Sequence, residues 1–200
     1  MRLLLMLICL SLAGQDMVVR RMARKAAPNA LYFGWPSDGS DPTGGSEVSG
    51  LSGYRIAELM QPYASRWTAP KTGAITAIEA WVKIASGTEY IRMAVYDATT
   101  STPPLICQYT AGVAVTNSSF AWIGSSATLT GACTVTSGSI YYVSISYQGS
   151  GITSYRPLGQ PSGTATSDAG HTYVADGMPS NLPGLTGSTT ALYALRAKVE

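Results

Sequence analysis

Histidine and charge are both scarce in this chain of 200 residues. His171 is the one histidine, so any histidine-based catalytic site has to be built around it. Charged residues make up 12% of the sequence, which leaves little material for long surface helices of the Glu/Lys type. The net charge of +2 is small and dispersed, whereas nucleic-acid-binding proteins usually gather Lys and Arg on one face. The composition therefore disfavours a helical protein and a nucleic-acid partner.

Cysteine is also rare, and its spacing excludes a zinc site. The three cysteines include no Cys-x-x-Cys pair, whereas structural zinc needs four clustered ligands. Cys107 and Cys133 either pair as a disulfide in an oxidising compartment or stay separate as buried thiols in a reducing one. Asp38 and Asp41 offer oxygen ligands for structural calcium, but we favour turn formation by these side chains. We expect no cofactor and no metal.

The residues of a recognisable active site are missing as well. No Gly-x-Ser-x-Gly motif accompanies His171, and a lone loop histidine is more often a surface or packing residue. Scattered acidic residues include no pair whose spacing singles it out for glycosidase chemistry. We therefore expect that the protein is not an enzyme.

The apolar run Leu3–Leu10 is too short to span a bilayer as a helix. With Met1-Arg2 before it and small residues after it, the run is typical of a secretory signal. The alternative is a retained segment that packs on the protein or on a neighbouring subunit. Residues 1–25, which end in a basic cluster, are expected to be one or the other, with no transmembrane span.

Residues 26–63 differ in composition from the rest of the chain. Turns and irregular structure are predicted by Pro28, Pro36, Pro42 and several glycines. Within this segment lies a cluster of large apolar side chains, whose exposure would be unfavourable. We expect this cluster to be an assembly arm that docks on another surface, and its residues are Leu31, Tyr32, Phe33 and Trp35.

Residues 64–200 are expected to form an antiparallel β-sandwich, because short β-rich runs alternate there with Gly, Pro, Ser and Thr. The runs are Ala74–Ile84, Tyr90–Tyr96, Leu105–Tyr109, Gly112–Val115 and Ile140–Tyr147. Alternate apolar residues predict the faces that point into the core. These residues are Ile78, Ala80, Val82, Ile84, Ile91, Met93, Val95, Tyr141, Val143, Ile145 and Tyr147. The chain is expected to end in a half-buried strand.

The opposite faces of these strands are expected to point outward. They carry Glu79, Trp81, Lys83, Arg92, Tyr96, Tyr142, Ser144, Ser146, Arg196 and Lys198. Twelve Tyr and four Trp against two Phe favour rings with a polar handle, which suit wet interfaces and sugar faces. Trp81 is the sharpest binding candidate, and the alternative is that the N-terminal arm covers it. Trp67 and Trp122 are expected in the core. Periodicity fails between Gly149 and Ser188, so this segment is a second candidate partner surface. Its binding candidates are Tyr155, Tyr173 and His171.

Several motifs together resemble a known group of modules. They are Arg66-Trp67-Thr68-Ala69-Pro70, Thr72–Ile78, Ile91–Asp97 with Pro103-Pro104-Leu105, and Leu129 with Gly138–Val143. This pattern resembles the jelly-roll modules of phage virion proteins, such as tail fibres and capsid decorations, and of secreted bacterial carbohydrate-binding or adhesive proteins. The resemblance covers roughly residues 64–148 and implies an all-β, antiparallel jelly-roll β-sandwich, here with an irregular N-terminal arm.

Two functions from different classes follow. The first is a non-enzymatic structural or attachment protein of an extracellular assembly, such as a phage virion subunit, whose partners are like subunits or other virion proteins. The second is a secreted carbohydrate-binding or adhesin module, whose partner is a cell-surface glycan. Either function places the protein in a virion or outside the cell. The apolar arm and the retained-segment interpretation of the N-terminus favour the first.

Overall fold

β-Strands are the regular secondary structure of the described residues, which are 31–43, 45–49, 63–124, 127–148, 152–157, 163–165, 177–182, 188–189 and 194–200 of the computed structural model. All of them belong to the unit Leu31–Glu200. The strands are β1 Tyr32–Gly34, β2 Gly45–Ser49, β3 Tyr63–Thr68, β4 Gly73–Ile84, β5 Glu89–Asp97, β6 Leu105–Tyr109, β7 Val113–Val115, β8 Ala121–Ile123, β9 Leu129–Gly131, β10 Thr134–Val135, β11 Ile140–Gln148, β12 Ile152–Pro157, β13 Gly163–Ala165, β14 Ser188–Thr189 and β15 Leu195–Val199.

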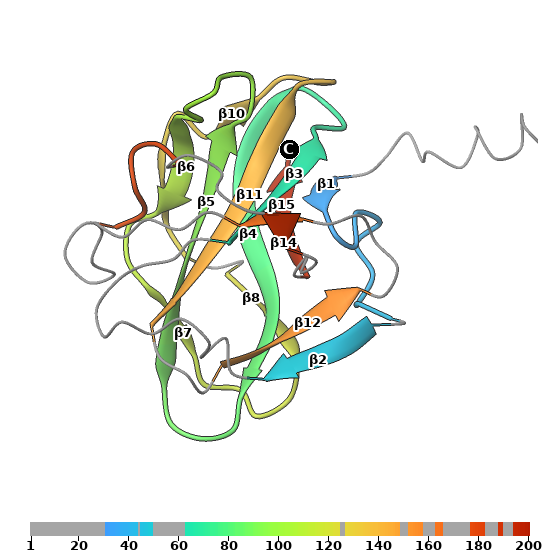
Figure 1. Cartoon of the computed structure of the whole chain (residues 1–200), viewed down its shortest axis with the longest axis vertical. Coiled ribbons are helices and arrows are strands. Elements are labelled where there is room, and N and C mark those ends of the chain that lie inside the picture. Colours follow the sequence, from blue (N-terminus) through green and yellow to red (C-terminus); the bar gives the residue numbers. More distant parts are fainter. Residues whose placement is uncertain are drawn as a thin grey trace, which may run out of the picture. The chain divides into compact units, whose positions relative to one another are not determined.

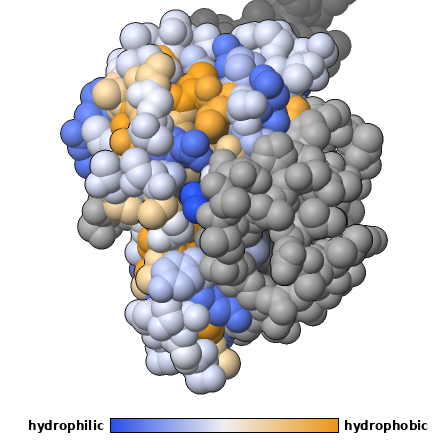
Figure 2. Space-filling view, turned by 90° about the vertical axis from the view of Figure 1, so that its left-hand side faces the viewer, coloured by the Kyte–Doolittle hydropathy of each residue, from blue (hydrophilic) through white to orange (hydrophobic). Residues whose placement is uncertain are grey.

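These strands form two antiparallel sheets that pack together as a sandwich (Figure 1). The first sheet has the order β1-β15-β4-β12-β2, with β8 and β10 also paired to β4, and the second has the order β14-β13-β3-β11-β5-β6-β9, with β7 paired to β5. On the side where β6 and β7 lie, hydrophobic residues form small groups among hydrophilic ones (Figure 2). The predicted all-β sandwich is thus confirmed.

The predicted inward faces form the core between the sheets. In β4, Ile78, Ala80, Val82 and Ile84 are buried, and in β5 so are Ile91, Met93 and Val95. Tyr141, Val143 and Ile145 of β11 are buried beside them, and Tyr147 is half-buried against the same cluster. Burying one such aliphatic side chain stabilises the fold by about 1.5–3 kcal/mol. The period-two pattern alone was enough to predict this core.

The outer face of the second sheet is covered, which corrects the prediction that Tyr96 and Tyr142 point outward. Both side chains are buried in a second cluster with Met178 and Leu182. The Tyr96 hydroxyl donates to the Pro179 carbonyl at 3.0 Å. Ser144 and Ser146 are also fully buried, so they do not face solvent either. The segment 177–182 packs over this face, and the pattern of the strand itself carries no sign of it.

A buried tyrosine ties strands from the two sheets together. Tyr109 of β6 accepts a hydrogen bond from the Ile78 amide of β4 at 2.8 Å. Its oxygen also lies 2.6 Å from the Ile78 carbonyl and 2.5 Å from the Gly124 carbonyl, to either of which its single proton can be donated. Burial raises the pKa of Tyr109 to about 12. The hydroxyl is therefore a neutral donor over the physiological pH range.

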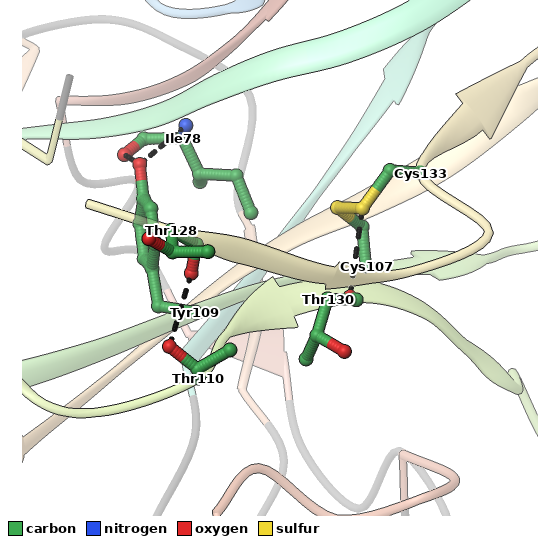
Figure 3. The surroundings of a disulfide bond; sticks show 7 residues. All are labelled: Ile78, Cys107, Tyr109, Thr110, Thr128, Thr130 and Cys133. Atoms are coloured by element: carbon green, nitrogen blue, oxygen red, sulfur yellow. Dashed lines mark hydrogen bonds between the residues drawn. A yellow bond between two sulfur atoms is a disulfide. The ribbon is translucent and has the colours of Figure 1, made fainter. Parts of the chain in front are cut away.

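The two candidate cysteines form a disulfide, Cys107–Cys133 (Figure 3). Cys107 is buried in β6, and Cys133 lies between β9 and β10 with a Cα–Cα distance of 4.6 Å across the bond. The structure thus selects the oxidised alternative of the two that the sequence left open. Disulfides persist in oxidising environments such as the cell exterior.

Candidate functional site

A buried ion pair lies on the outer face of the first sheet, where other residues cover it. Arg196 of β15 stands opposite Glu79 of β4 in the strand register, and Arg196 Nε donates to Glu79 Oε2 at 2.8 Å. The two side chains are only 5% and 8% exposed. Both were predicted to point into solvent, and this prediction is wrong because other side chains and residues 38–41 cover them. A buried charge is tolerated when it is paired and hydrogen-bonded.

Two aromatic rings enclose the guanidinium of Arg196. Its Cζ lies 3.6 Å from the centre of the Trp122 ring and 4.2 Å from the centre of the Tyr32 ring. Trp122 belongs to β8 and Tyr32 to β1, so the arginine joins residues from both sides of its own strand. A guanidinium stacks well on aromatic faces because it is planar and weakly hydrated. Arg196 is therefore held by charge on one side and by rings on two others.

The row of rings and cations continues across β4. Trp81 faces Trp122 in the strand register, with ring centres 5.4 Å apart and planes tilted by 56°. Phe120 is stacked on Trp81 at 6.3 Å with an angle of 6° between the planes. Lys83 Nζ lies 4.5 Å from the centre of the Phe120 ring. We call this set the cation–aromatic row, and its members are Tyr32, Arg196, Trp122, Trp81, Phe120 and Lys83.

Most members of the row are half-buried, and Arg196 is buried. The order of the row means that ring faces are largely occupied by a neighbouring ring or cation. Such a surface is preformed, apolar in body and polar at its margin, which is the composition that interface cores favour.

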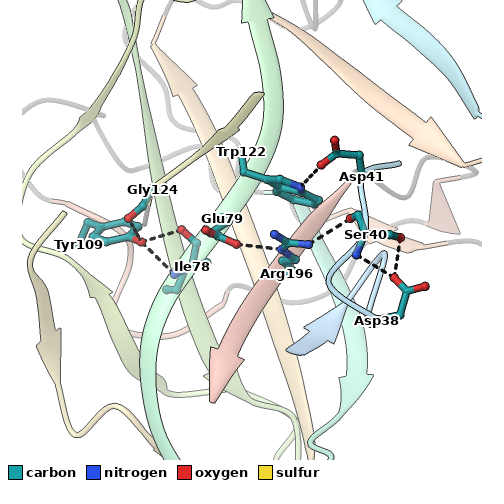
Figure 4. Close-up of polar contacts among 9 residues, drawn as sticks. All are labelled: Asp38, Ser40, Asp41, Ile78, Glu79, Tyr109, Trp122, Gly124 and Arg196. Carbon is teal, nitrogen blue, oxygen red and sulfur yellow. Dashed lines mark hydrogen bonds and ion pairs between the residues drawn. The ribbon is translucent and has the colours of Figure 1, made fainter. Parts of the chain in front are cut away.

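Residues 38–41 lie against one end of the row (Figure 4). The Arg196 Nη1 atom donates to the Ser40 carbonyl at 3.2 Å, and Trp122 Nε1 donates to Asp41 Oδ1 at 3.2 Å. Asp38 Oδ1 accepts hydrogen bonds from the Ser40 hydroxyl and amide, which lower the pKa of the Asp38 carboxyl. Asp38 is thus engaged in the turn that the sequence favoured, and Asp41 orients Trp122.

The predicted site residues lie in different parts of the structure. Trp81 lies on the outer face as predicted, but in contact with other rings. Trp122 was expected in the core and instead lies in the same outer row, whereas Trp67 packs against the core cluster. His171 and Tyr173 lie outside the described residues, and for Tyr155 only the backbone, in β12, is described. The remaining predicted residues belong to the arm.

The predicted arm is in part a strand of the sandwich itself. Tyr32–Gly34 forms β1 and pairs with β15, and Phe33 is 2% exposed in the main core cluster. Its ring centre lies 5.9 Å from that of Tyr141. Leu31 remains 43% exposed, and Trp35 is half-buried. The apolar cluster therefore docks on its own chain, at the edge of the first sheet.

The described residues hold neither a metal cluster nor a membrane-spanning helix. Within the described ranges, no three His, Cys, Asp or Glu side chains are grouped so that they could hold a metal ion. The part of the chain that the structure describes also has no helix with the length and apolar character needed to cross a membrane. No protein-family model, no curated protein and no solved structure matches the chain.

Proposed function

We propose that the chain is a non-enzymatic structural or attachment subunit of an extracellular assembly, of the kind found in phage virions as a capsid decoration, tail or fibre protein. The cation–aromatic row carries this proposal. The motifs of residues 64–148 resemble the jelly-roll modules of such proteins. The disulfide fits an extracellular setting.

The composition of the row favours a protein partner. Interface cores are enriched in Trp, Tyr, Phe and Arg, and their anchors work best when they are already rigid. Trp122 is fixed on two sides, by its hydrogen bond to Asp41 and by the stacked Arg196. Little side-chain entropy would then be lost on binding, because the rings are ordered before the partner arrives.

A secreted carbohydrate-binding or adhesin module is the alternative. The half-buried Trp81 supports it, because the C–H groups of a sugar ring can stack on an electron-rich indole face. In the row, however, Phe120 is stacked on Trp81 and Trp122 is tilted against it. A flat sugar would have to displace one of these neighbours. This geometry favours the subunit function over the glycan-binding function.

The mass of the native particle tests the proposal. We expect light scattering and electron microscopy of the full chain to show a particle larger than a 20.9 kDa monomer. Trp81→Ala with Phe120→Ala should weaken assembly while the fold is retained. Tyr90→Ala is the matched control, because Tyr90 is 41% exposed on the second sheet and lies outside the row. A stable monomer at high concentration would refute the subunit function.

A glycan array tests the alternative with the same variants. Binding of the wild-type chain to a glycan, lost in Trp81→Ala and kept in Tyr90→Ala, would favour the carbohydrate-binding module. Mass spectrometry of the mature N-terminus adds an independent readout. Removal of residues 1–13 would count against a retained assembly segment.

A further inference from the structure

One stretch of chain supplies the outermost strands on one side of the first sheet. β1 pairs with β15, and β2 pairs with β12. β15 and β12 follow one another along the same side of β4, because Ala80 and Val82 each also pair with β8 on the opposite side. Both strands lie within residues 31–49, which we call the edge segment. The rest of the first sheet comes from residues 73–199, and the next strand along the chain, β3, belongs to the second sheet. The edge segment therefore contributes two outer strands to a sheet whose other strands come from later in the chain.

Specific contacts hold the edge segment on its docking site. The Val199 amide donates to the Leu31 carbonyl at 2.7 Å, and the Trp35 amide donates to the Leu195 carbonyl at 3.0 Å. Phe33 inserts into the core, and Arg196 contacts both the Tyr32 ring and the Ser40 carbonyl. Strand pairing, a buried anchor and a charged group together make this a recognition site rather than a loose contact.

The fit at Gly34 shows how closely the two surfaces match. A Cβ atom at this position would lie 2.3 Å from the Leu195 carbonyl oxygen and 2.4 Å from the Arg196 Cα. The φ angle of Gly34 is also positive, at 129°, where other residues are strained. Glycine therefore lets β1 pack directly against β15 without this overlap. The edge segment of another copy carries the same glycine.

The connection to the rest of the chain is long enough to reach a neighbour. Residues 50–62 lie between β2 and β3 in the sequence, and thirteen extended residues span at most about 45 Å. This exceeds the diameter of a small domain, which is about 30 Å. The same segment of one subunit can therefore dock on the first sheet of an adjacent subunit without a change in any docked contact.

We propose that the edge segment is exchanged between copies, so that the site on β15 and β12 of one subunit holds residues 31–49 of another. The proposal rests on the subunit function proposed above and names the partner as a second copy of this chain. Exchange conserves the docked interactions, so its free energy depends mainly on the connecting residues and on protein concentration. The buried Glu79–Arg196 pair gives the site its selectivity, because it needs the Tyr32 ring and the Ser40 carbonyl to cover it.

Cysteine pairs distinguish exchange from docking within one chain. Tyr32 and Lys198 face each other across β1 and β15, and the flanking bonds of Leu31 with Val199 and of Trp35 with Leu195 make them a non-hydrogen-bonded pair. Such pairs have Cα atoms about 4.5 Å apart, which suits a disulfide. One tagged chain carries Tyr32→Cys and a differently tagged chain carries Lys198→Cys, both in a Cys9→Ser background, and the two are co-expressed. A non-reducing gel reads the product.

Exchange predicts a covalent heterodimer at twice the monomer mass. The control pair is Tyr90→Cys in one chain and Ala114→Cys in the other, which face each other across β5 and β7 away from the edge segment and should give no heterodimer. A single chain that carries both Tyr32→Cys and Lys198→Cys checks the local geometry. If that chain forms no disulfide at all, β1 is not docked on β15 and the proposal loses its basis.

Light scattering of the wild-type chain separates the failure of this inference from the failure of the proposed function. A multimer in which the 32–198 disulfide forms only within single chains overturns exchange and leaves the subunit function standing. A monomer overturns both. A multimer with the between-chain disulfide supports both.

Discussion

The guanidinium of Arg196 stacks 3.6 Å from the centre of the Trp122 ring while its Nε atom is bonded to the carboxylate of Glu79. One side chain thus joins the buried structure of the first sheet to the surface that we propose as a partner site. A substitution that breaks the ion pair should therefore also disturb the Trp122 ring in the cation–aromatic row.

Arg196→Met should destabilise the fold by about 3–5 kcal/mol, because it leaves Glu79 buried and uncompensated. The double variant Glu79→Leu with Arg196→Met should regain much of this loss, since an apolar pair of similar volume carries no desolvation cost. Urea unfolding at equilibrium measures both free energies. A loss below about 1 kcal/mol in the single variant would show that the pair behaves as an exposed salt bridge.

Gly34→Ala should release β1 from the sheet, because its Cβ would overlap the Leu195 carbonyl oxygen. We expect a loss of about 2–4 kcal/mol and faster proteolysis near residue 34. Gly87→Ala is the matched control, since Gly87 has a positive φ of 83° with nothing within 4 Å of the added atom. Gly87→Ala should destabilise the fold by only about 1 kcal/mol, because alanine is strained at a positive φ even without a clash. Equal losses in the two variants would rule out the steric argument.

The sequence predicted the sandwich well because alternation is a local property of a strand. Ile78, Met93 and Val143 each follow from neighbours within a few positions, and each is fully buried. The same pattern assigned the opposite faces to solvent and was wrong at Glu79 and Tyr96. Whether a second face is covered depends on segments that are distant in the chain, such as Met178 over Tyr96.

The candidate site was harder to predict for the same reason. Arg196 and Glu79 are 117 positions apart, and Trp81 meets Trp122 only through the register of β4 with β8. Trp81 was identified because a tryptophan stood between two charged residues on an outward face. An acid and a base on the outer faces of two different strands were a signal that could have suggested the pair, but nothing in the sequence gave the register that joins them.

Loss of the Cys107–Cys133 disulfide should destabilise the chain by about 3–4 kcal/mol, on the chain-entropy relation for a loop of this size, since 26 positions separate the cysteines. The bond limits the unfolded ensemble more than it adds contacts to the folded state. Urea unfolding of Cys107→Ala with Cys133→Ala, compared with the oxidised chain, measures the difference. Cys9→Ser serves as the control for removal of a cysteine outside the bond. The same stability in the double variant as in this control would contradict the prediction.

Tyr109→Phe should lose stability at neutral pH by about 1–3 kcal/mol, because the Ile78 amide and the Gly124 carbonyl lose their buried partner.

The pKa of Tyr109 is raised from an ordinary 10.0 to about 12 in the folded chain. Unfolding therefore releases a proton above pH 10, and the stability supplied by the tyrosine is complete below pH 10 and declines as the pH rises toward 12. The decline is about 1.4 kcal/mol per pH unit at most. All other groups titrate alike in both proteins. The difference in unfolding free energy between wild type and Tyr109→Phe should therefore narrow from pH 10 to pH 12. Urea unfolding of wild type and variant at neutral pH and between pH 10 and pH 12 measures this difference. A constant difference would mean that folding does not raise the pKa of Tyr109.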